Sequence, residues 1–467
     1  MAIRLRMSRH SAVPDRPSNL SFWLLIAFLA ILWAAGGASR ADVLGQPFIR
    51  FSAWSIIMVA ILALPRVDWR AVKEPAIILG AAALLVALQL VPLPPTIWSQ
   101  LPGRAIFTEA GILTGNEQPW RPISISPSGT TNALGSLIVP AVVLMLAANL
   151  TREQHWRIAI FILGLVAAGA VLGVLQFSGI HFDNALINTV PSAVAGNLAN
   201  RNHFALSLAI GCVLALAWAF CEETRPWKAA VAFAVILIFI LLILATGSRS
   251  GLILGLLAIA LTFFMLRKYV SPRSMVIPRG FAGAIFTLGI AVLIGTIWLS
   301  VGLDRAFSID RVTAAAHEAD LRWQIWPVVR TMALSYSPVG TGLGTFDAAF
   351  RISEPDGILN PKYINMAHND WLQIFLEAGL LGIGFSGATV VWLCLRSFQA
   401  WTLLTEAKTG RLLSAAGSII ITLIFIASMT DYPAHTPFMM ALLALGAIWL
   451  VKETSVAGCT RKGRGVT

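Results

Sequence analysis

Long apolar runs separated by short polar segments follow one another along most of the chain. As a helix, a run of roughly 20 apolar residues is long enough to cross a hydrocarbon core of about 30 Å. Twelve such runs can be drawn, at Ser21–Gly37, Phe48–Leu64, Ala76–Leu93, Ala133–Asn149, Ile158–Phe177, His203–Phe220, Ala229–Thr246, Gly251–Leu266, Phe281–Val301, Trp371–Leu395, Leu412–Met429 and Thr436–Val451. The pattern predicts an all-α polytopic membrane protein with about twelve transmembrane helices.

One polar stretch is much longer than the others and separates the ninth run from the tenth. It covers about residues 302–370, where we expect a large extracytoplasmic loop with short helices. Residues 1–301 then form helices 1–9, and residues 371–467 form helices 10–12 and a cytoplasmic tail, all within one integral membrane domain. The first outer loop, at about residues 94–132, is rich in Pro, Gly, Ser and Thr and is predicted to be an interfacial lid or a packing segment with little chemistry of its own.

Composition supports the membrane class. Hydrophobic residues make up 57% of the chain, charged residues only 12%, and the mean hydropathy of +0.78 excludes an ordinary soluble domain. The four cysteines imply no disulfide or metal framework.

The basic residues indicate how the chain is oriented in the membrane. Of the 34 Lys and Arg residues, 22 fall at the termini or in the loops on the same side as the termini, so both termini are predicted to be cytoplasmic. Because the net charge of +12 is spread over short loops, it favours topology and anionic lipid contacts over a nucleic-acid partner. The first run is predicted to be a retained helix, since removing it as a signal peptide would invert this charge bias.

Titratable residues gather where the long loop meets the tenth run, in the segment Ala367–Gln373. His368 there could exchange protons near pH 7, because histidine side chains ordinarily titrate near pH 6.5. Asp370 could orient its imidazole. Asn369 or Asp370 could equally cap the following helix, which leaves open a purely structural role for His368.

Two further polar segments are predicted at the outer surface. Asn200, Arg201 and Asn202 open the sixth run, where asparagines are often helix caps. Arg249 lies at the apex of a tight turn between the seventh and eighth runs, where an arginine either binds an anion or extends to the interface.

The long loop contains a predicted helix followed by a glycine-rich segment. The helix spans about residues 314–334 and projects Arg322, with Trp326 suited to the membrane interface. In the segment Pro338–Phe346, Gly342 and Gly344 permit either a nest of backbone N–H groups that binds phosphate or a tight turn that packs the loop.

In order and spacing these segments resemble the O-antigen ligase and polymerase superfamily of bacterial inner-membrane glycan transferases. The resemblance rests on the segment from Gly196, the Arg249 turn, the Arg322 helix, the glycine segment and the Ala367–Gln373 block with the following Glu377–Gly382. The first four runs carry almost none of it. It implies a GT-C-like membrane fold with the active site at the periplasmic face of the inner membrane.

The resemblance also implies a reaction and residue roles. Members move a glycan from an undecaprenyl-diphosphate carrier to a sugar of lipid A core or to another glycan, with metal-independent, inverting chemistry and no cofactor. Arg249 and Arg322 match the arginines that hold the diphosphate, and His368 matches the histidine that acts near the acceptor hydroxyl. Such a base suits a sugar hydroxyl, and guanidinium groups suit a departing diphosphate.

Alternative functions remain open from the sequence. A polymerase shares the donor site with a ligase and differs in its acceptor, and some members could attach glycans to protein. A transporter would also have twelve spans, but it would place ionisable residues near the middle of the membrane, where this chain has few apart from Glu377. Weaker site candidates are His317, His435 with Asp431, and Arg201; Arg305, Arg311 and Arg351 could guide the anionic donor.

Overall fold

The computed structural model describes residues 19–64, 66–116, 118–180, 182–188, 193–221, 226–269, 322–359, 364–402 and 411–462. The ninth predicted run, at Phe281–Val301, and the candidates His317, Arg305 and Arg311 lie outside these residues. Within them the fold is all-α apart from one pair of two-residue strands.

The first half of the bundle runs from α1 to α8. Its helices are α1 (Asn19–Ala35), α2 (Gly45–Ala63), α3 (Lys73–Leu88), α4 (Pro95–Trp98), α5 (Ala105–Leu113), α6 (Pro127–Ser136), α7 (Ile138–Ala148) and α8 (Arg152–Phe177). Strands β1 (Pro92–Leu93) and β2 (Arg121–Pro122) pair antiparallel beside α4 and α5. The predicted run Ala76–Leu93 therefore ends early as a helix, at Leu88.

The second half contains the longest helix of the described chain. Its elements are α9 (Arg201–Ala219), α10 (Pro226–Ala245), α11 (Arg249–Tyr269), α14 (Phe346–Ser353), η1 (Asp356–Ile358), α15 (Asp370–Thr402), α16 (Leu412–Ala427), η3 (Pro433–His435) and α17 (Pro437–Lys462). Residues 322–335 are also helical, as predicted for this part of the loop. Each predicted run other than Phe281–Val301 overlaps a helix, and the run Ala133–Asn149 covers the end of α6 and all of α7.

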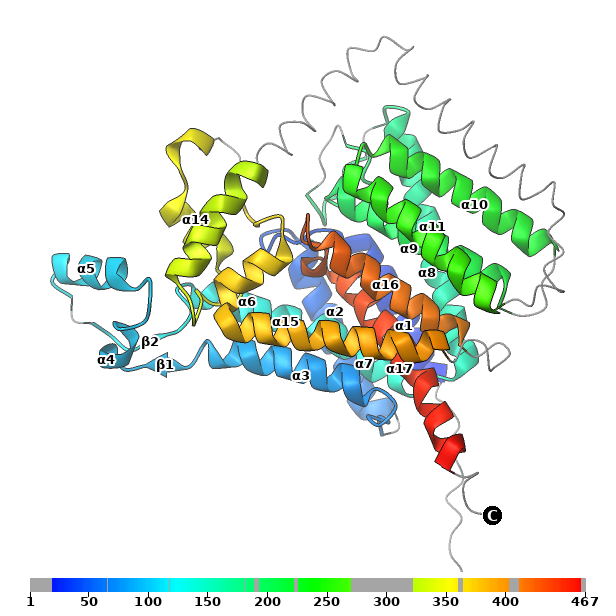
Figure 1. The fold of residues 1–467 in the computed structure, drawn as a ribbon, viewed down its shortest axis with the longest axis horizontal. Helices are drawn as coiled ribbons and strands as arrows, with labels where there is room; N and C mark the ends of the chain where they lie inside the picture. Colours follow the sequence, from blue (N-terminus) through cyan, green and yellow to red (C-terminus); the bar gives the residue numbers. More distant parts are fainter. Residues whose placement is uncertain are drawn as a thin grey trace, which may run out of the picture.

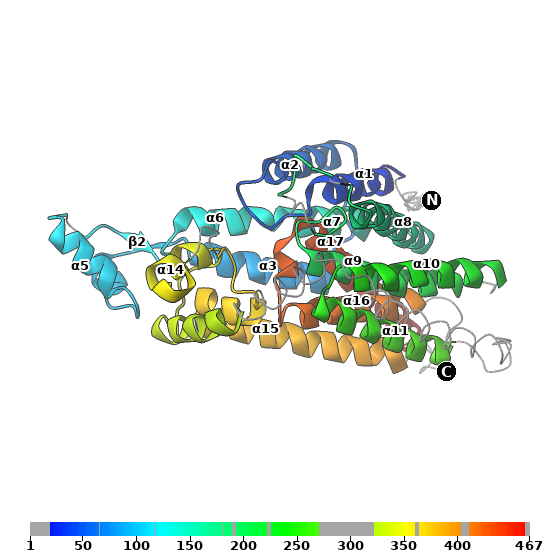
Figure 2. The same ribbon diagram turned by 90° about the horizontal axis from the view of Figure 1, so that it is seen from above.

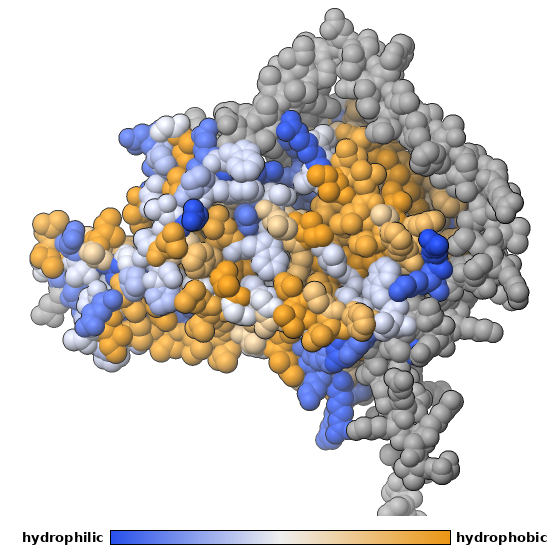
Figure 3. All heavy atoms as spheres, in the orientation of Figure 1, coloured by the Kyte–Doolittle hydropathy of each residue, from blue (hydrophilic) through white to orange (hydrophobic). Residues whose placement is uncertain are grey.

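Helix α9 forms the centre of the bundle. Nearly all of its side chains are buried, and it packs against α8, α10, α11 and α16. The outer helices instead expose large apolar side chains, and Figure 3 shows hydrophobic surface over α10 and along the edge formed by α3 and α15. Seven described helices are long and apolar enough to cross a membrane, and three shorter ones are also apolar. These features define a multi-pass membrane protein.

The bundle has one end rich in loops and another at which the described chain begins and ends. Helices α5, α6 and α14 lie at the first end in Figure 2, and Figure 1 places α4 beside α5. At the opposite end, Asn19 at the start of α1 contacts Gln154, and Lys452 of α17 donates to the carbonyl oxygens of Ala148 and Leu150. The start of α1 and the Lys452 turn of α17 thus lie at the same end of the bundle, and the cytoplasmic location of this end stays a prediction.

Helix α15 is broken at Gly379, where the glycine segment of the long loop inserts. Gly379 has φ 57°, and a Cβ there would lie 2.0 Å from the carbonyl oxygen of Pro338, so only glycine fits. The Leu380 N–H donates to that same oxygen, and Thr341 and Gly342 donate to the carbonyl oxygens of Leu376 and Glu377. The break exchanges helical hydrogen bonds for bonds to the loop.

The first outer loop, residues 94–132, packs against the glycine segment and is bonded to it through Arg104. Arg104 is fully buried and donates to the carbonyl oxygens of Ile123 (2.6 Å) and Gly340 (2.9 Å). Its guanidinium also lies over the Tyr336 ring. Burial lowers the pKa of Arg104 to about 10, which leaves it cationic at neutral pH. The contacts agree with the packing role predicted for this loop.

Candidate functional site

Asp431 is the centre of a polar cluster at the loop-rich end of the bundle. It lies between α16 and α17, and its side chain is only 3% exposed. Its carboxylate accepts hydrogen bonds from the side-chain amides of Asn200 (3.1 and 3.2 Å) and Asn202 (2.5 Å), and from the Tyr432 N–H (3.0 Å). A buried carboxylate needs such donors, because leaving its oxygens unpaired is costly.

Three cationic or titratable side chains face the same carboxylate. Nδ1 of His368 lies 3.5 Å from Oδ1 of Asp431, and Nε2 of His203 lies 3.7 Å from it. A terminal nitrogen of Arg322 lies 3.9 Å from Oδ2. The side chain of His203 is only 1% exposed, whereas those of His368 and Arg322 are 26% and 20% exposed. His368 and Arg322 are therefore the members of the cluster that a substrate can reach.

The environment keeps Asp431 ionised. Burial raises the pKa of Asp431, but the imidazoles of His203 and His368 beside it lower it by more, and the net pKa lies well below the usual range for an aspartate. The carboxylate is thus a permanent negative charge behind the two histidines.

The start of α9 brings its two asparagines to the cluster. Asn200 is the N-cap of α9, and its side-chain oxygen accepts from the Asn202 N–H at 2.8 Å. Asn202 in turn accepts from the Ser248 hydroxyl at 2.7 Å, which connects α9 to the turn before α11. Arg249 follows Ser248 as the first residue of α11 and is exposed. Arg201 is the first residue of α9 and is half-buried.

His368 is held in an unusual backbone conformation. Its φ is 50°, in the left-handed region that few residues other than glycine adopt. Trp326 donates from its indole to the carbonyl oxygen of Ala367 at 3.1 Å, and the Tyr432 ring meets the imidazole edge to face at 4.9 Å. The side chain of Asn369 accepts from the Leu372 N–H, which fulfils its predicted capping role at the start of α15. Local strain of this kind persists where surrounding contacts enforce it.

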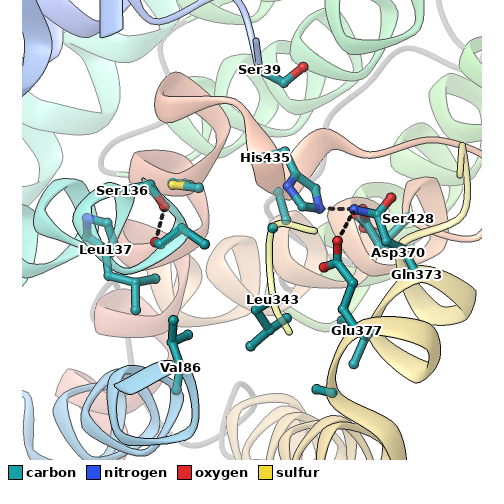
Figure 4. Close-up of a pocket in the computed structure, with 18 of the residues that line it drawn as sticks. Ser39, Val86, Ser136, Leu137, Leu343, Asp370, Gln373, Glu377, Ser428 and His435 are labelled. Carbon is teal, nitrogen blue, oxygen red and sulfur yellow. Dashed lines mark hydrogen bonds and ion pairs between the residues drawn. The ribbon is translucent and has the colours of Figure 1, made fainter. Parts of the chain in front are cut away.

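Asp370 pairs with His435 instead of orienting His368. Nε2 of His435 lies 3.2 Å from Asp370 Oδ1, and the Ser428 hydroxyl donates to Asp370 Oδ2 at 2.7 Å (Figure 4). The alternative role suggested for Asp370 is thus not the one the structure shows. Helix α15 starts at Asp370 and turns its side chain toward the loop after α16, and Asp431 faces His368 in its place.

The second pair has its own electrostatics. Burial lowers the pKa of His435, but the carboxylates of Asp370 and Glu377 raise it by more, so the net pKa is above the usual value for a histidine. Glu377 itself is anchored, because Oε1 accepts from the Phe346 N–H at 2.9 Å.

The structure favours the packing interpretation of the glycine segment. The backbone N–H groups of Thr341, Gly342 and Phe346 donate to α15, and that of Leu343 donates to Oε1 of Gln89 at 2.8 Å. Gly344 lies against Gly129 of α6 so closely that a Cβ would clash with its backbone. A phosphate nest needs free N–H groups, and these are already bonded within the protein.

The cluster shows which residues sequence reasoning found and which it missed. His368, Arg322, Asn200 and Asn202 come together as a site. Asp431 appeared only as a weak candidate, and His203 only as the first residue of the sixth apolar run. Among the described residues, no group of three or more His, Cys, Asp or Glu side chains is placed to share a metal ion.

The family model described as O-antigen ligase (Wzy_C) matches residues 233–387. Over these residues the resemblance drawn from the sequence is confirmed. The matched segment contains Arg249, Arg322 and His368, whereas Asp431 and the start of α9 lie outside it.

The chain is also similar to one chain of a solved structure described as "Structural coordination of polymerization and crosslinking by a peptidoglycan synthase complex". The two are 15% identical, with 83% of this chain and 97% of that chain covered and a TM-score of 0.41. No curated protein matches the chain.

Proposed function

We propose that the protein is an O-antigen ligase-like glycosyltransferase. It would move a glycan from an undecaprenyl-diphosphate carrier to a hydroxyl of lipid A core, at the periplasmic face of the bacterial inner membrane and with both termini in the cytoplasm. The observation that carries the proposal is the partly exposed His368, backed by the buried Asp431 carboxylate and adjacent to Arg322. The family match to residues 233–387 supports lipid-linked glycans as the substrate class.

His368 suits the role of general base. Its Nδ1 is buried against Asp431, which leaves Nε2 as the nitrogen that can meet a substrate. Nε2 takes the proton of the acceptor hydroxyl while the hydroxyl oxygen forms a bond to the anomeric carbon of the donor. Asp431 stabilises the imidazolium that results, as a carboxylate behind a catalytic histidine does. A single displacement of this kind inverts the anomeric centre.

Arg322 and Arg249 suit the leaving group. The bond from the anomeric carbon to the diphosphate oxygen breaks as the acceptor attacks, and negative charge develops on the departing lipid diphosphate. Arg322 is only loosely paired at 3.9 Å from Asp431, and the exposed Arg249 follows the Ser248 that contacts Asn202. Guanidinium groups stabilise a diphosphate by paired hydrogen bonds and need no divalent ion to do so.

The direct test measures glycan transfer in membranes from a strain that lacks its own ligase. The membranes are supplied with undecaprenyl-diphosphate-linked glycan, and lipopolysaccharide is followed by gel mobility for the wild type and for His368→Ala. The expected result is glycan on lipid A core with the wild type only, while His368→Ala inserts normally but loses transfer by at least about 100-fold.

Other outcomes separate the alternatives. Longer lipid-linked chains without transfer to core would assign a polymerase of the same superfamily, which shares the donor and the base. No change in either product would leave a transporter as the better description. Full transfer by His368→Ala would refute the base assignment.

A further inference from the structure

A large apolar cavity lies beside the polar cluster, between α3, α7, α15, α16 and α17 (Figure 4). Its volume is about 850 Å³, within the range of about 300–1,000 Å³ typical of small-molecule sites. One wall is the length of α3 from Pro75 to Val86, which corresponds to about 17 Å along the helix axis. Leu144 of α7 and Ala447 of α17 add further apolar side chains to the lining of the cavity. The cavity therefore has the length and lining of a site for a hydrocarbon chain.

The loop-rich end of this cavity carries a cation without a carboxylate partner. Arg50 of α2 lines the cavity and donates to the backbone carbonyl oxygen of Asn132 at 3.2 Å and to its side chain. Its Nε is buried and has no hydrogen-bond partner among the described residues. An arginine in the second turn of a membrane helix needs partners for its N–H groups, and Asn132 satisfies only a terminal nitrogen.

The acidic side chains that line the cavity are already engaged elsewhere. Asp42 pairs with Arg40, and Asp347 pairs with Arg351. Asp370 pairs with His435, and Glu377 accepts from the Phe346 N–H. In the part of the chain that the structure describes, no carboxylate lies within ion-pair distance of Arg50. A phosphate at the cavity end would supply the missing negative charge and an acceptor for Nε.

The cavity and the polar cluster share a wall. Asp370, Ser428 and His435 line the cavity, while His368 and Asp431, in the same two chain segments, belong to the cluster. A lipid seated in the cavity would hold its head group at the loop-rich end, close to His368. Arg322 belongs to the cluster on the other side of this wall, and Arg249 follows Ser248, whose hydroxyl donates to Asn202 of the cluster.

We infer that the cavity binds the acceptor, a phosphorylated and acylated glycolipid, with an acyl chain along α3 and a phosphate on Arg50. The inference rests on the proposed function for the identity of the acceptor. Donor and acceptor lipids then enter from opposite sides of the wall formed by the segments that contain His368 and Asp431. A small neutral head group would leave Arg50 without an anionic partner, so the site selects lipids that carry phosphate near the chain.

Binding of rough lipopolysaccharide, which consists of lipid A core with its phosphates, tests the inference by native mass spectrometry of the purified full chain. Arg50→Ala is expected to weaken binding at least tenfold, and Arg50→Lys is expected to retain part of it. Ala82→Trp, which fills the cavity from α3, is also expected to weaken binding at least tenfold. Ala81→Trp is the matched control, because Ala81 is the exposed neighbour on the same helix and does not line the cavity.

The competing probes are undecaprenyl phosphate, phosphatidylglycerol and dephosphorylated lipid A core. Unchanged binding of rough lipopolysaccharide to both Arg50→Ala and Ala82→Trp would overturn the inference. So would loss of undecaprenyl phosphate binding alone, which would assign the cavity to the carrier lipid, or equal binding of phosphatidylglycerol, which would make it a general lipid site. Binding needs no transfer, so a wild type that binds rough lipopolysaccharide through Arg50 but transfers nothing would refute the proposed function and leave the acceptor site standing.

Discussion

The protein holds two histidine–aspartate pairs within a few residues of one another, and they differ in what surrounds them. His368 and Asp431 share their site with Arg322 and two asparagines, and the histidine is partly exposed. In the second pair, His435 and Asp370, the Ser428 hydroxyl donates to Asp370, and both members line the apolar cavity. Neither pair joins sequence neighbours. His368 is two residues from Asp370 but pairs with Asp431, and His435 is four residues from Asp431 but pairs with Asp370. The two pairs consist of the same residue types, so their surroundings are the basis for proposing catalysis for the first pair and a structural role for the second.

Removing the charge of the first pair should have the largest effect. Asp431→Asn keeps the shape of the side chain but cannot stabilise an imidazolium, so we expect transfer to fall by about 10²- to 10⁴-fold. Because the pKa of Asp431 is depressed, the wild-type carboxylate stays charged from pH 5 to 9, whereas the asparagine amide stays neutral, so the defect should persist across this range. Initial rates of transfer across that pH range measure this. Asp347→Asn, on an exposed ion pair, is the control, and near-normal rates for Asp431→Asn would show that the two pairs are equivalent.

The cation beside the first pair should come next. Arg322→Lys exchanges a planar fork for a point charge, and we expect a loss of about ten- to a hundredfold in the use of lipid-diphosphate donor. Arg249→Lys should act in the same direction. Arg330→Lys, on the exposed side of the same helix as Arg322, should leave donor use unchanged. Titration of the donor at saturating acceptor distinguishes these results, and equal losses in Arg322→Lys and Arg330→Lys would argue against a specific contact.

The second pair should matter for stability more than for transfer. The pKa of His435 is raised in the folded protein, so its pairing with Asp370 stabilises the fold below the ordinary histidine pKa of about 6.5 and is lost as pH rises through the raised value. His435→Gln should therefore lower the melting temperature more at pH 5.5 than at pH 9, while transfer changes only a few-fold. Thermal unfolding in detergent at both pH values tests this. A loss of transfer as large as that of Asp431→Asn would bring the second pair into the chemistry.

Chelation should have the smallest effect on either pair. Both pairs combine side chains that bind metals in other proteins, but the roles proposed for them are proton transfer and structural pairing. We expect EDTA-treated, purified protein to keep its rate of transfer. Activity that disappears with EDTA and returns with a divalent ion would contradict the metal-free mechanism.

The sequence predicted the parts of the fold that depend on local pattern. Apolar runs located the helices because a span must satisfy its own backbone within lipid. His368 and Arg322 were accessible to the same reasoning, since each lies in a polar segment of recognisable order. The central position of Asp431 could not be predicted in this way. Its partners Asn200 and Asn202 lie more than 200 residues away in the chain and meet it only through packing of α9 against α16.

The role of the glycine segment also depends on tertiary contacts that the local sequence does not predict. Its composition allowed either a phosphate nest or a packed turn, and the choice depends on what the N–H groups meet. They meet the break in α15 at Gly379 and the side chain of Gln89, neither of which is signalled by local sequence. The local sequence therefore shows which conformations a loop can adopt, and tertiary contacts decide whether its N–H groups bond to the protein or stay free for a ligand.

Arg104 has a consequence for how this protein can be recombined. Its hydrogen bonds to Ile123 and Gly340 join the first outer loop to the glycine segment, and Gln89 makes a second link to Glu377 and Leu343. The segment matched by the family model, residues 233–387, thus lacks both of these links and also lacks Asp431. A chimera that exchanges only that segment between two homologues would separate these interlocking surfaces.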